Sequence, residues 1–216
     1  MKKIDDQRIA DIISDKWDVP EESRLAENHE ELLAIVTELR KLGLTIVLTV
    51  GVYDSYHIGH ARYLKQAKKL GDIVIVGIDT DEFTRARKGI HRPMVPYTER
   101  WEMLVHGRYA NIVTSLNSSE ENISLLKAMK PDVILLSFSS VKDNFDDYAE
   151  RMHKKYDPLC GRLEILQRQA ETSSSAMRTK IVEDGGRSLV ETVEDITAKL
   201  KNAVEDFFVQ ARGGTE

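Results

Sequence analysis

The side chains best suited to chemistry lie in one short stretch, residues 50–60, which reads Val-Gly-Val-Tyr-Asp-Ser-Tyr-His-Ile-Gly-His. His57 and His60 are three residues apart, so they share one face of a first helical turn. A helix N-terminus presents unpaired N–H groups and positive potential, both of which favour a phosphate. Two imidazoles there can donate hydrogen bonds to phosphate oxygens. Gly59 removes a side chain between them, and Gly51 permits close approach to the backbone. The stretch therefore predicts a phosphate-binding turn.

Other chemistries for the same histidines are less well supported. A His-x-x-His pair can bind zinc, but Cys160 is the only cysteine and no helical His-Glu-x-x-His occurs. A purely structural role for both histidines is the other alternative. No Gly-x-Gly-x-x-Gly follows the preceding strand pattern, and no Gly-Lys-Ser/Thr phosphate loop is present. The predicted site is therefore a phosphate site of another kind, and no metal ligand is identified.

The elements that must position this turn follow from the hydrophobic pattern. Residues 45–50 are apolar and β-branched, as in a strand covered on both faces, and a helical pattern follows at residues 58–70. Strand and helix patterns then alternate, which predicts an α/β fold with a doubly wound parallel sheet. Further strands are expected near residues 73–78, 110–114, 133–138 and 163–166, further helices near 27–42, 98–106, 118–130, 145–155 and from 174, and a polar loop at 79–97.

The same pattern divides the chain into three parts. Residues 1–43 are predicted to form an N-terminal helical extension, residues 44–184 the α/β domain, and residues 185–216 a C-terminal helix, with Gly185-Gly186 at the second boundary. The C-terminal helix is expected to pack on the domain or on a dimer partner. Its apolar positions are Leu189, Val193, Ile196, Leu200, Val204 and Phe207.

Composition limits the classes of function. The chain has 216 residues and a net charge of −5, from 31 basic and 36 acidic side chains. This balance argues against nucleic-acid binding by bulk charge. Apolar runs are too short for a signal peptide or a membrane span, and a single cysteine fits a reducing compartment. We expect a soluble cytoplasmic protein without nucleic-acid or membrane partners.

Four sequence blocks carry a resemblance to a known family. Gly51-Val52-Tyr53-Asp54 followed by His57-Ile58-Gly59-His60 resembles the Gly-Thr-Phe-Asp…His-x-Gly-His signature of the cytidylyltransferase-like nucleotidyltransferases. The acidic end of the second strand, the basic segment 88–100 and the seryl segment 172–178 resemble later blocks of that family, in the same order. Within the family the chain is most similar to the adenylyltransferase domain of ADP-heptose synthase. It is nearly as similar to glycerol-3-phosphate cytidylyltransferase and archaeal FAD synthase.

The resemblance implies a Rossmann-like enzyme that transfers AMP or CMP from ATP or CTP to a phosphorylated acceptor, such as heptose 1-phosphate, and releases pyrophosphate. It also implies Mg²⁺ bound with the triphosphate, and a homodimer. The catalytic residues that it implies are His57, His60, Lys88 and Arg100. The implied nucleotide-binding residues are Gly51, Val52, Tyr53, Gly59, Arg168, Ser173, Ser174, Ser175 and Arg178. The implied acceptor-binding residues are Asp54, Asp81 and Arg92.

Two departures from the family pattern leave alternatives open. Val52-Tyr53 replaces the usual Thr-Phe, and Ser137-Phe138-Ser139-Ser140 stands where sugar-phosphate branches carry a turn with Gly and Asp. Polyol-phosphate cytidylylation and FMN adenylylation therefore stay open beside a sugar-phosphate acceptor. The same departures leave open a catalytically silent regulatory protein that binds nucleotide on this fold.

Overall fold

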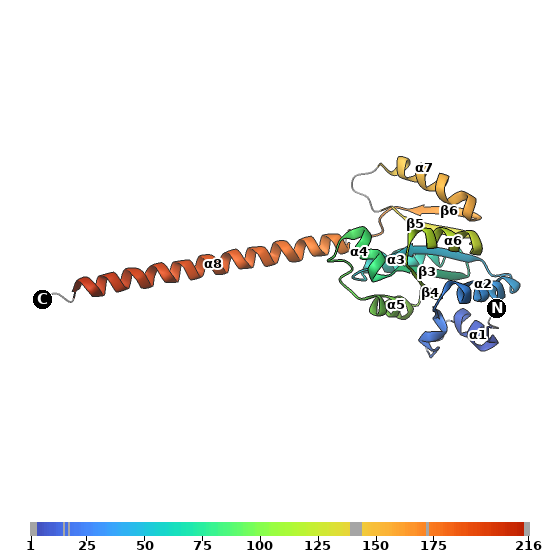
Figure 1. The fold of residues 1–216 in the computed structure, drawn as a ribbon, viewed down its shortest axis with the longest axis horizontal. Coiled ribbons are helices and arrows are strands. Elements are labelled where there is room, and N and C mark those ends of the chain that lie inside the picture. The colour runs from blue at the N-terminus through green and yellow to red at the C-terminus, as the bar shows by residue number, and fades with distance from the viewer. Residues whose placement is uncertain (1–3, 15, 17, 139–143, 172, 214–216) are drawn as a thin grey trace. The chain divides into compact units, whose positions relative to one another are not determined.

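The computed structural model describes residues 4–14, 16, 18–138, 144–171 and 173–213, with no side chains described beyond residue 202. In this part of the chain six parallel strands form one sheet in the order β1-β4-β3-β2-β5-β6 (Figure 1). The strands are β1 (Leu25–Ala26), β2 (Ile46–Gly51), β3 (Ile73–Asp79), β4 (Ile112–Leu116), β5 (Val133–Ser137) and β6 (Arg162–Leu166). This order confirms the predicted doubly wound parallel sheet.

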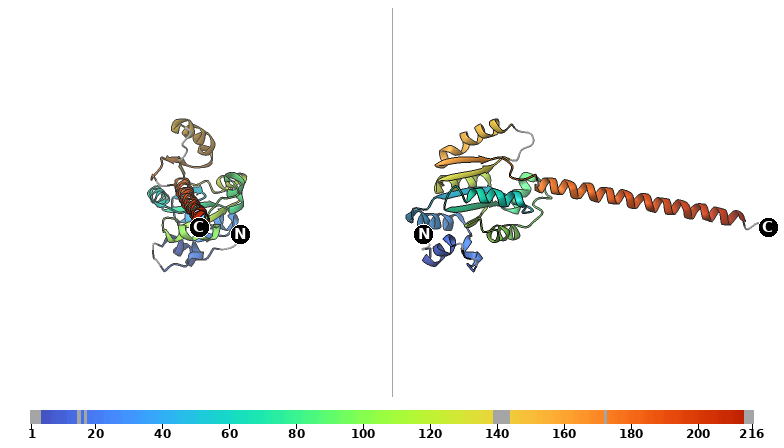
Figure 2. Two further views of the ribbon diagram at one scale, coloured as in Figure 1. Left: turned by 90° about the vertical axis from the view of Figure 1, so that its left-hand side faces the viewer. Right: turned by 180° about the vertical axis from the view of Figure 1, so that it is seen from behind.

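Helices connect the strands and cover both faces of the sheet (Figure 2). Along the chain these helices are α1 (Asp6–Ile13), η1 (Glu21–Arg24), α2 (His29–Lys41), α3 (Ile58–Ala67), α4 (Asp81–Lys88), α5 (Tyr97–His106), α6 (Ser119–Met129), α7 (Phe145–Tyr156) and η2 (Asp157–Leu159). A further helix, α8 (Ser174–Gly213), follows the last strand in the sequence. Successive strand residues point to opposite faces, so β2 contributes to two cores. Leu48 packs with Ile35 on the face covered by α1, α2 and α6, and Val47 packs with Leu64 on the face covered by α3 and α5.

The N-terminal segment is integrated into the sheet rather than standing apart as an extension. β1 pairs in parallel with β4, with Leu25 opposite Val113. The predicted helix at 27–42 is confirmed as α2, and its Leu32, Ile35 and Leu39 are fully buried in the core shared with the central strands. The edge strand was not predicted because two residues are too few to produce a hydrophobic pattern.

The predicted polar loop at 79–97 is wrong in its first half, because α4 occupies Asp81–Lys88. Thr80 caps this helix, and its hydroxyl accepts a hydrogen bond from the N–H of Phe83 at 3.4 Å. Thr84 is the one buried residue of α4. A helix this charged shows no apolar stripe, so the pattern that reveals other helices is missing here.

The chain divides into two compact units, Met1–Thr172 and Ser173–Glu216. The second unit holds α8, a helix of 40 residues. α8 continues through Gly185 and Gly186, where the sequence analysis placed the boundary between the α/β domain and the C-terminal helix. Each glycine within a helix lowers the stability of that helix by roughly 1 kcal/mol relative to alanine. The helix-forming residues on both sides of the two glycines offset this loss. Across the described residues, we find no helix that combines the length and apolar character needed to cross a membrane.

Candidate active site

The loop between β2 and α3 lies where the strand order of the sheet reverses. β2 is flanked by β3 on one side and by β5 on the other. Open α/β sheets bind ligands at the carboxyl ends of strands, at this switch point. Residues 52–57 therefore occupy the position at which this fold class binds a ligand.

A tight turn buries Tyr53 beneath this loop. Tyr53 and Ser55 have positive φ angles of 54° and 51°, which residues with a Cβ rarely adopt. The Tyr53 hydroxyl lies 3.4 Å from Oγ1 of Thr49, and a Cβ on Gly51 would lie 3.2 Å from the Tyr53 ring. Gly51 therefore makes room for a buried ring. Val52 and Tyr53 are also buried, and the contact predicted between the backbone of residues 51–53 and a nucleotide stays a prediction.

His57 caps α3, and its ring has a fixed orientation. The N–H of Gly59 donates a hydrogen bond of 3.0 Å to Nδ1 of His57. Because Nδ1 is an acceptor, the neutral ring carries its proton on Nε2. Partial burial, followed by the nearby charge of Arg168, lowers the pKa of His57. His57 is therefore a neutral Nε2–H donor at the start of a helix near pH 7.

His60 stacks on His57 within the first turn of α3. The ring centroids are 4.0 Å apart with 24° between the planes, and the Tyr53 ring lies 5.2 Å from His60. Burial, followed by the adjacent His57, lowers the pKa of His60 to about 4, an effect that Asp54 opposes and Lys88 increases. The structure thus brings the two predicted imidazoles together as neutral groups.

His60 should make the stability of the fold depend on pH. Its pKa is about 4 in the folded protein against 6.5 for an ordinary histidine, so between these values the unfolded chain binds more protons. The stability contributed by the neutral ring is complete above pH 6.5 and is lost as the pH falls towards 4. We expect the free energy of unfolding of the wild type, relative to His60→Gln, to fall by about 2–3 kcal/mol over this range in urea titrations. A difference that is constant with pH would contradict the buried neutral ring.

Asp54 ties the loop after β2 to the segment after α4. Its Oδ1 accepts hydrogen bonds from the backbone N–H groups of Met94 and Val95 at 3.0 and 3.1 Å, and its Oδ2 lies 2.8 Å from Nε of Arg92. The Asp54 and Arg92 side chains are 1% and 9% exposed. Both were predicted to bind the acceptor. The structure pairs them with each other, so they hold two loops of the site together.

Arg100 is a buried positioning residue that links the segments around the histidine turn. Its guanidinium donates to the carbonyl oxygens of Val95, Val52 and Asp79 at 2.9, 2.5 and 2.9 Å, and to Oδ1 of Asp81 at 2.7 Å. The Arg100 side chain is completely buried. Asp81, predicted to bind the acceptor, is paired with Arg100 in this structure. The contacts predicted for Arg100 with a nucleotide and for Asp81 with the acceptor stay predictions.

Lys88 ends α4 beside these paired groups and stays exposed. Partial desolvation, followed by the cations Arg92 and Arg87, lowers the pKa of Lys88, while Asp79 and Asp54 oppose this. Asp79 itself accepts a hydrogen bond of 2.7 Å from Arg87, and burial raises the pKa of Asp79. Asp79 was not predicted, although its place at the end of β3 is a signal that could have found it. Lys88 keeps the solvent access that contact with a phosphate requires.

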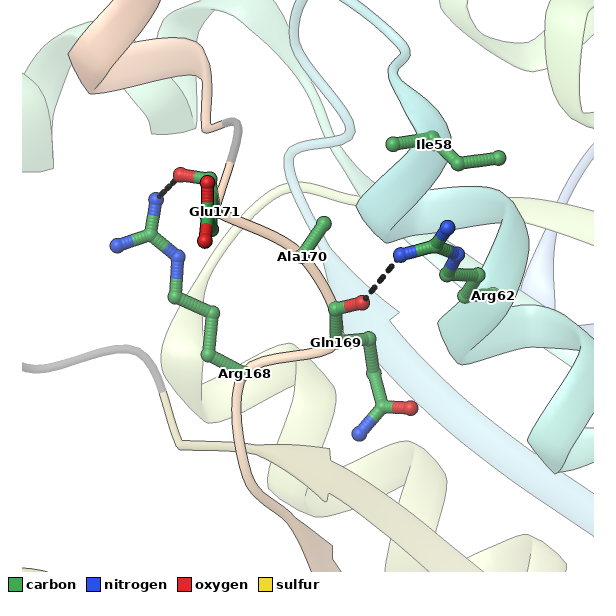
Figure 3. A pocket seen from close by; sticks show the side chains of 6 residues that line it. All are labelled: Ile58, Arg62, Arg168, Gln169, Ala170 and Glu171. Atoms are coloured by element: carbon green, nitrogen blue, oxygen red, sulfur yellow. Dashed lines mark hydrogen bonds between the residues drawn. The ribbon is translucent and has the colours of Figure 1, made fainter.

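A pocket of about 710 Å³ opens beside the N-terminus of α3, and Figure 3 shows the side chains that line it. Arg62 of α3 donates to the carbonyl of Gln169 at 3.3 Å, and Arg168 donates to the carbonyl of Glu171 (Figure 3). The pocket borders the histidine turn, because a Cβ on Gly59 would lie 3.4 Å from Cβ of Ala170. The structure therefore brings the predicted Arg168 to the site. Arg62 was missed, since no motif marks it.

The seryl segment belongs to the second unit and is described by itself. Ser173 Oγ accepts a hydrogen bond from the N–H of Ala176 at 3.1 Å, as an N-cap does. Arg178 donates to the carbonyl of Ser174 at 3.2 Å and to Oγ of Ser175 at 3.1 Å. The phosphate contacts predicted for these residues stay predictions. Thr172, Ser139 and Ser140 lie outside the described residues.

A doubly wound parallel sheet with a paired-imidazole turn at its switch point defines a Rossmann-like class of nucleotide-binding proteins. A family model described as Cytidylyltransferase-like matches residues 48–180, which is more than half of the chain. The chain belongs to the cytidylyltransferase-like family and is a nucleotidyltransferase by class.

The chain is also similar to individual proteins. The chain is 30% identical over 155 residues to the bifunctional protein HldE of Desulfatibacillum aliphaticivorans, a match that covers 72% of this chain and 30% of that protein. It is 35% identical over 109 residues to HldE of a Nitratiruptor species, covering 50% and 23%. A solved structure described as a lipopolysaccharide core biosynthesis protein from Thermoplasma volcanium GSS1 is 24% identical, covers 60% of this chain and 100% of that chain, and has a TM-score of 0.48. The matches thus span less than a third of the two curated relatives.

Proposed function

We propose that this protein transfers AMP or CMP from ATP or CTP to a phosphorylated small molecule and releases pyrophosphate. The observation that carries the proposal is the stacked pair of neutral imidazoles, His57 and His60, at the N-terminus of α3. A helix N-terminus attracts anions, and imidazole N–H groups donate to phosphate oxygens. A nucleoside triphosphate has the negative charge that the helix N-terminus attracts and the phosphate oxygens that accept hydrogen bonds from the imidazoles.

The proposed reaction is an in-line displacement at the α-phosphorus. An oxygen of the acceptor phosphate forms a new bond to this phosphorus. The bond from the α-phosphorus to the oxygen that bridges to the β-phosphorus breaks, and pyrophosphate leaves with that oxygen and its electron pair. The acceptor is already an anion, so the reaction requires no general base. Catalysis then depends on positioning and on stabilising developing charge, which is the role proposed for His57 and His60.

Cationic side chains around the turn are proposed to hold the rest of the substrates. Lys88 is exposed and lies close enough to His60 to affect its pKa, which supports a contact with a substrate phosphate. Arg168 affects the pKa of His57 and lines the adjoining pocket together with Arg62. We propose that this pocket takes part of the nucleotide.

Mg²⁺ is proposed to arrive with the triphosphate rather than to occupy a cage of protein oxygens. Magnesium prefers oxygen ligands, chiefly carboxylates and phosphates. Each carboxylate described around the turn is already paired with an arginine, so this set does not fit a dedicated magnesium site. The pairs are Asp54 with Arg92, Asp79 with Arg87, and Asp81 with Arg100.

The proposed acceptor is a sugar phosphate such as heptose 1-phosphate. The match to HldE proteins supports this choice over glycerol 3-phosphate or FMN. Because the matches span less than a third of those relatives, the proposal concerns the nucleotidyltransferase reaction alone.

Pyrophosphate release tests the proposal. The purified chain is mixed with ATP or CTP and with heptose 1-phosphate, glycerol 3-phosphate or FMN in turn, and His60→Ala serves as the control for contaminating activity. We expect sustained release in at least one pairing and none without an acceptor. Binding of ATP or CTP without release in any pairing would overturn the transfer reaction and favour a regulatory nucleotide-binding protein.

Gly59→Ala should lower turnover by about 10²-fold while the protein stays folded. The new Cβ would lie 2.8 and 2.9 Å from Cε1 and Nδ1 of His57, so the ring that the Gly59 N–H now orients must move. Misplacement of a transition-state donor by about 1 Å can cost this factor. Gly185→Ala is the matched control, since no atom lies within 4 Å of its added Cβ. Equal turnover in both variants would show that the orientation of His57 does not matter.

A further inference from the structure

One face of α8 carries a regular apolar seam that the proposed reaction does not use. The five large apolar side chains of this seam are more than half exposed, from 53% to 72%. They are Val182, Leu189, Val193, Ile196 and Leu200. Between Val182 and Leu189 the seam position is occupied by Gly186. Beyond Leu200 the sequence places Ala203 and Phe207 at the next two seam positions. A contiguous exposed apolar stripe marks an interaction surface.

The spacing of the seam is that of a coiled coil. From Val182 onward the seam positions recur in alternating steps of four and three residues. This 3.5-residue repeat keeps a seam facing one partner helix along its whole length, whereas a straight helix with 3.6 residues per turn drifts away from it. The seam therefore fits a second long helix that winds around α8 better than it fits the compact surface of a globular unit.

The other described helices do not supply such a partner. The longest of them is α2, with 13 residues, which is shorter than the seam between Val182 and Leu200. Within the part of the chain that the structure covers, no helix other than α8 itself is long enough to pair with the whole seam. A second copy of the chain would supply a helix of that length.

The residues beside the seam suit pairing with an identical helix. When two copies meet, like charges next to the seam would repel each other. Val190, Thr192 and Thr197 flank the seam and are uncharged. The nearest charged flanking residues, Glu183 and Lys199, have opposite signs. Charges concentrate on the outward face instead, at Arg187, Glu191, Glu194, Asp195 and Lys201.

We propose that α8 pairs with α8 of a second copy of this chain through the seam from Val182 to Leu200, and so makes the protein a dimer. The proposal is independent of the nucleotidyltransferase reaction, because it uses none of the residues of the histidine turn. It also gives the homodimer implied by the family resemblance a particular interface.

The test measures the mass of the full chain in solution by light scattering during gel filtration. The wild type is expected at twice the chain mass of 24.6 kDa. Val193→Glu with Leu200→Glu places two charges in the seam and should weaken the dimer by at least about 100-fold, leaving monomer at micromolar concentration. Ser188→Glu with Ala198→Glu is the matched control, because it adds the same charges on the outward face.

Helix content and pyrophosphate release keep the outcomes distinct. Circular dichroism checks that the seam variant is folded, and unchanged release checks that the first unit is intact. A monomeric wild type would overturn the proposal and indicate that the seam packs within one chain or on a different partner. A seam variant that stays dimeric, or a control that dissociates equally, would also overturn it.

Discussion

Alanine in place of either His57 or His60 is expected to lower turnover by roughly 10²–10³, or about 3–4 kcal/mol of transition-state stabilisation. Both rings are neutral near pH 7 because burial lowers their pKa values, so they act as hydrogen-bond donors rather than as fixed cations. Such donors contribute most where charge develops on the phosphate oxygens during the reaction. The effect should therefore appear in kcat, as measured by pyrophosphate release under saturating nucleotide.

Two further variants separate chemistry from folding. His57→Asn keeps a side-chain acceptor at the N-cap of α3 but removes the Nε2–H donor, so it should preserve stability and still lose turnover. His153→Ala removes an exposed histidine of α7 that pairs with Asp157, outside the site, and should leave turnover unchanged. Near-wild-type turnover in His57→Ala or His60→Ala would contradict the assigned role.

Arg100→Met is expected to lower the free energy of unfolding by about 3–5 kcal/mol. The substitution fills similar space but leaves the Asp81 carboxylate and three backbone carbonyls without their donor. Buried polar groups that lose their partners account for this cost. Urea denaturation followed by circular dichroism measures it.

Arg85→Met provides the comparison for Arg100. Arg85 lies 3.9 Å from the same Asp81 carboxylate, but its side chain is 48% exposed. Surface pairs of this kind contribute about 0–1 kcal/mol, so this variant should be nearly as stable as the wild type. If Arg100→Met kept full stability and lost only turnover, Arg100 would be a substrate-binding residue after all.

The backbone of the site could be predicted from the sequence because local patterns determine it. An apolar strand run, a glycine and a helical repeat place the histidine turn at the end of β2, and the spacing of His57 and His60 places both on one helical turn. Alternating strands and helices then lead to a doubly wound sheet with few competing topologies. These signals depend only on neighbouring residues.

The partners of charged side chains could not be predicted in the same way. Asp54 and Arg92 are 38 positions apart, and Arg100 binds carbonyl groups from three separate segments. A motif shows that such residues belong near the site, but not whether they face a ligand or each other. That choice depends on how the loops pack, and in this structure Asp54, Arg92 and Arg100 pair with other groups of the protein.

Binding of a triphosphate by the paired histidines is tested most directly by nitrogen NMR of the ¹⁵N-labelled imidazoles. The chain has six histidines, so their ring signals can be assigned through single substitutions and followed while ATP or CTP is added with Mg²⁺. We predict that the His57 and His60 signals shift in a saturable way, that His57 reports a proton on Nε2, and that His153 stays unmoved. Saturable shifts elsewhere in the protein, with His57 and His60 unchanged, would contradict the account.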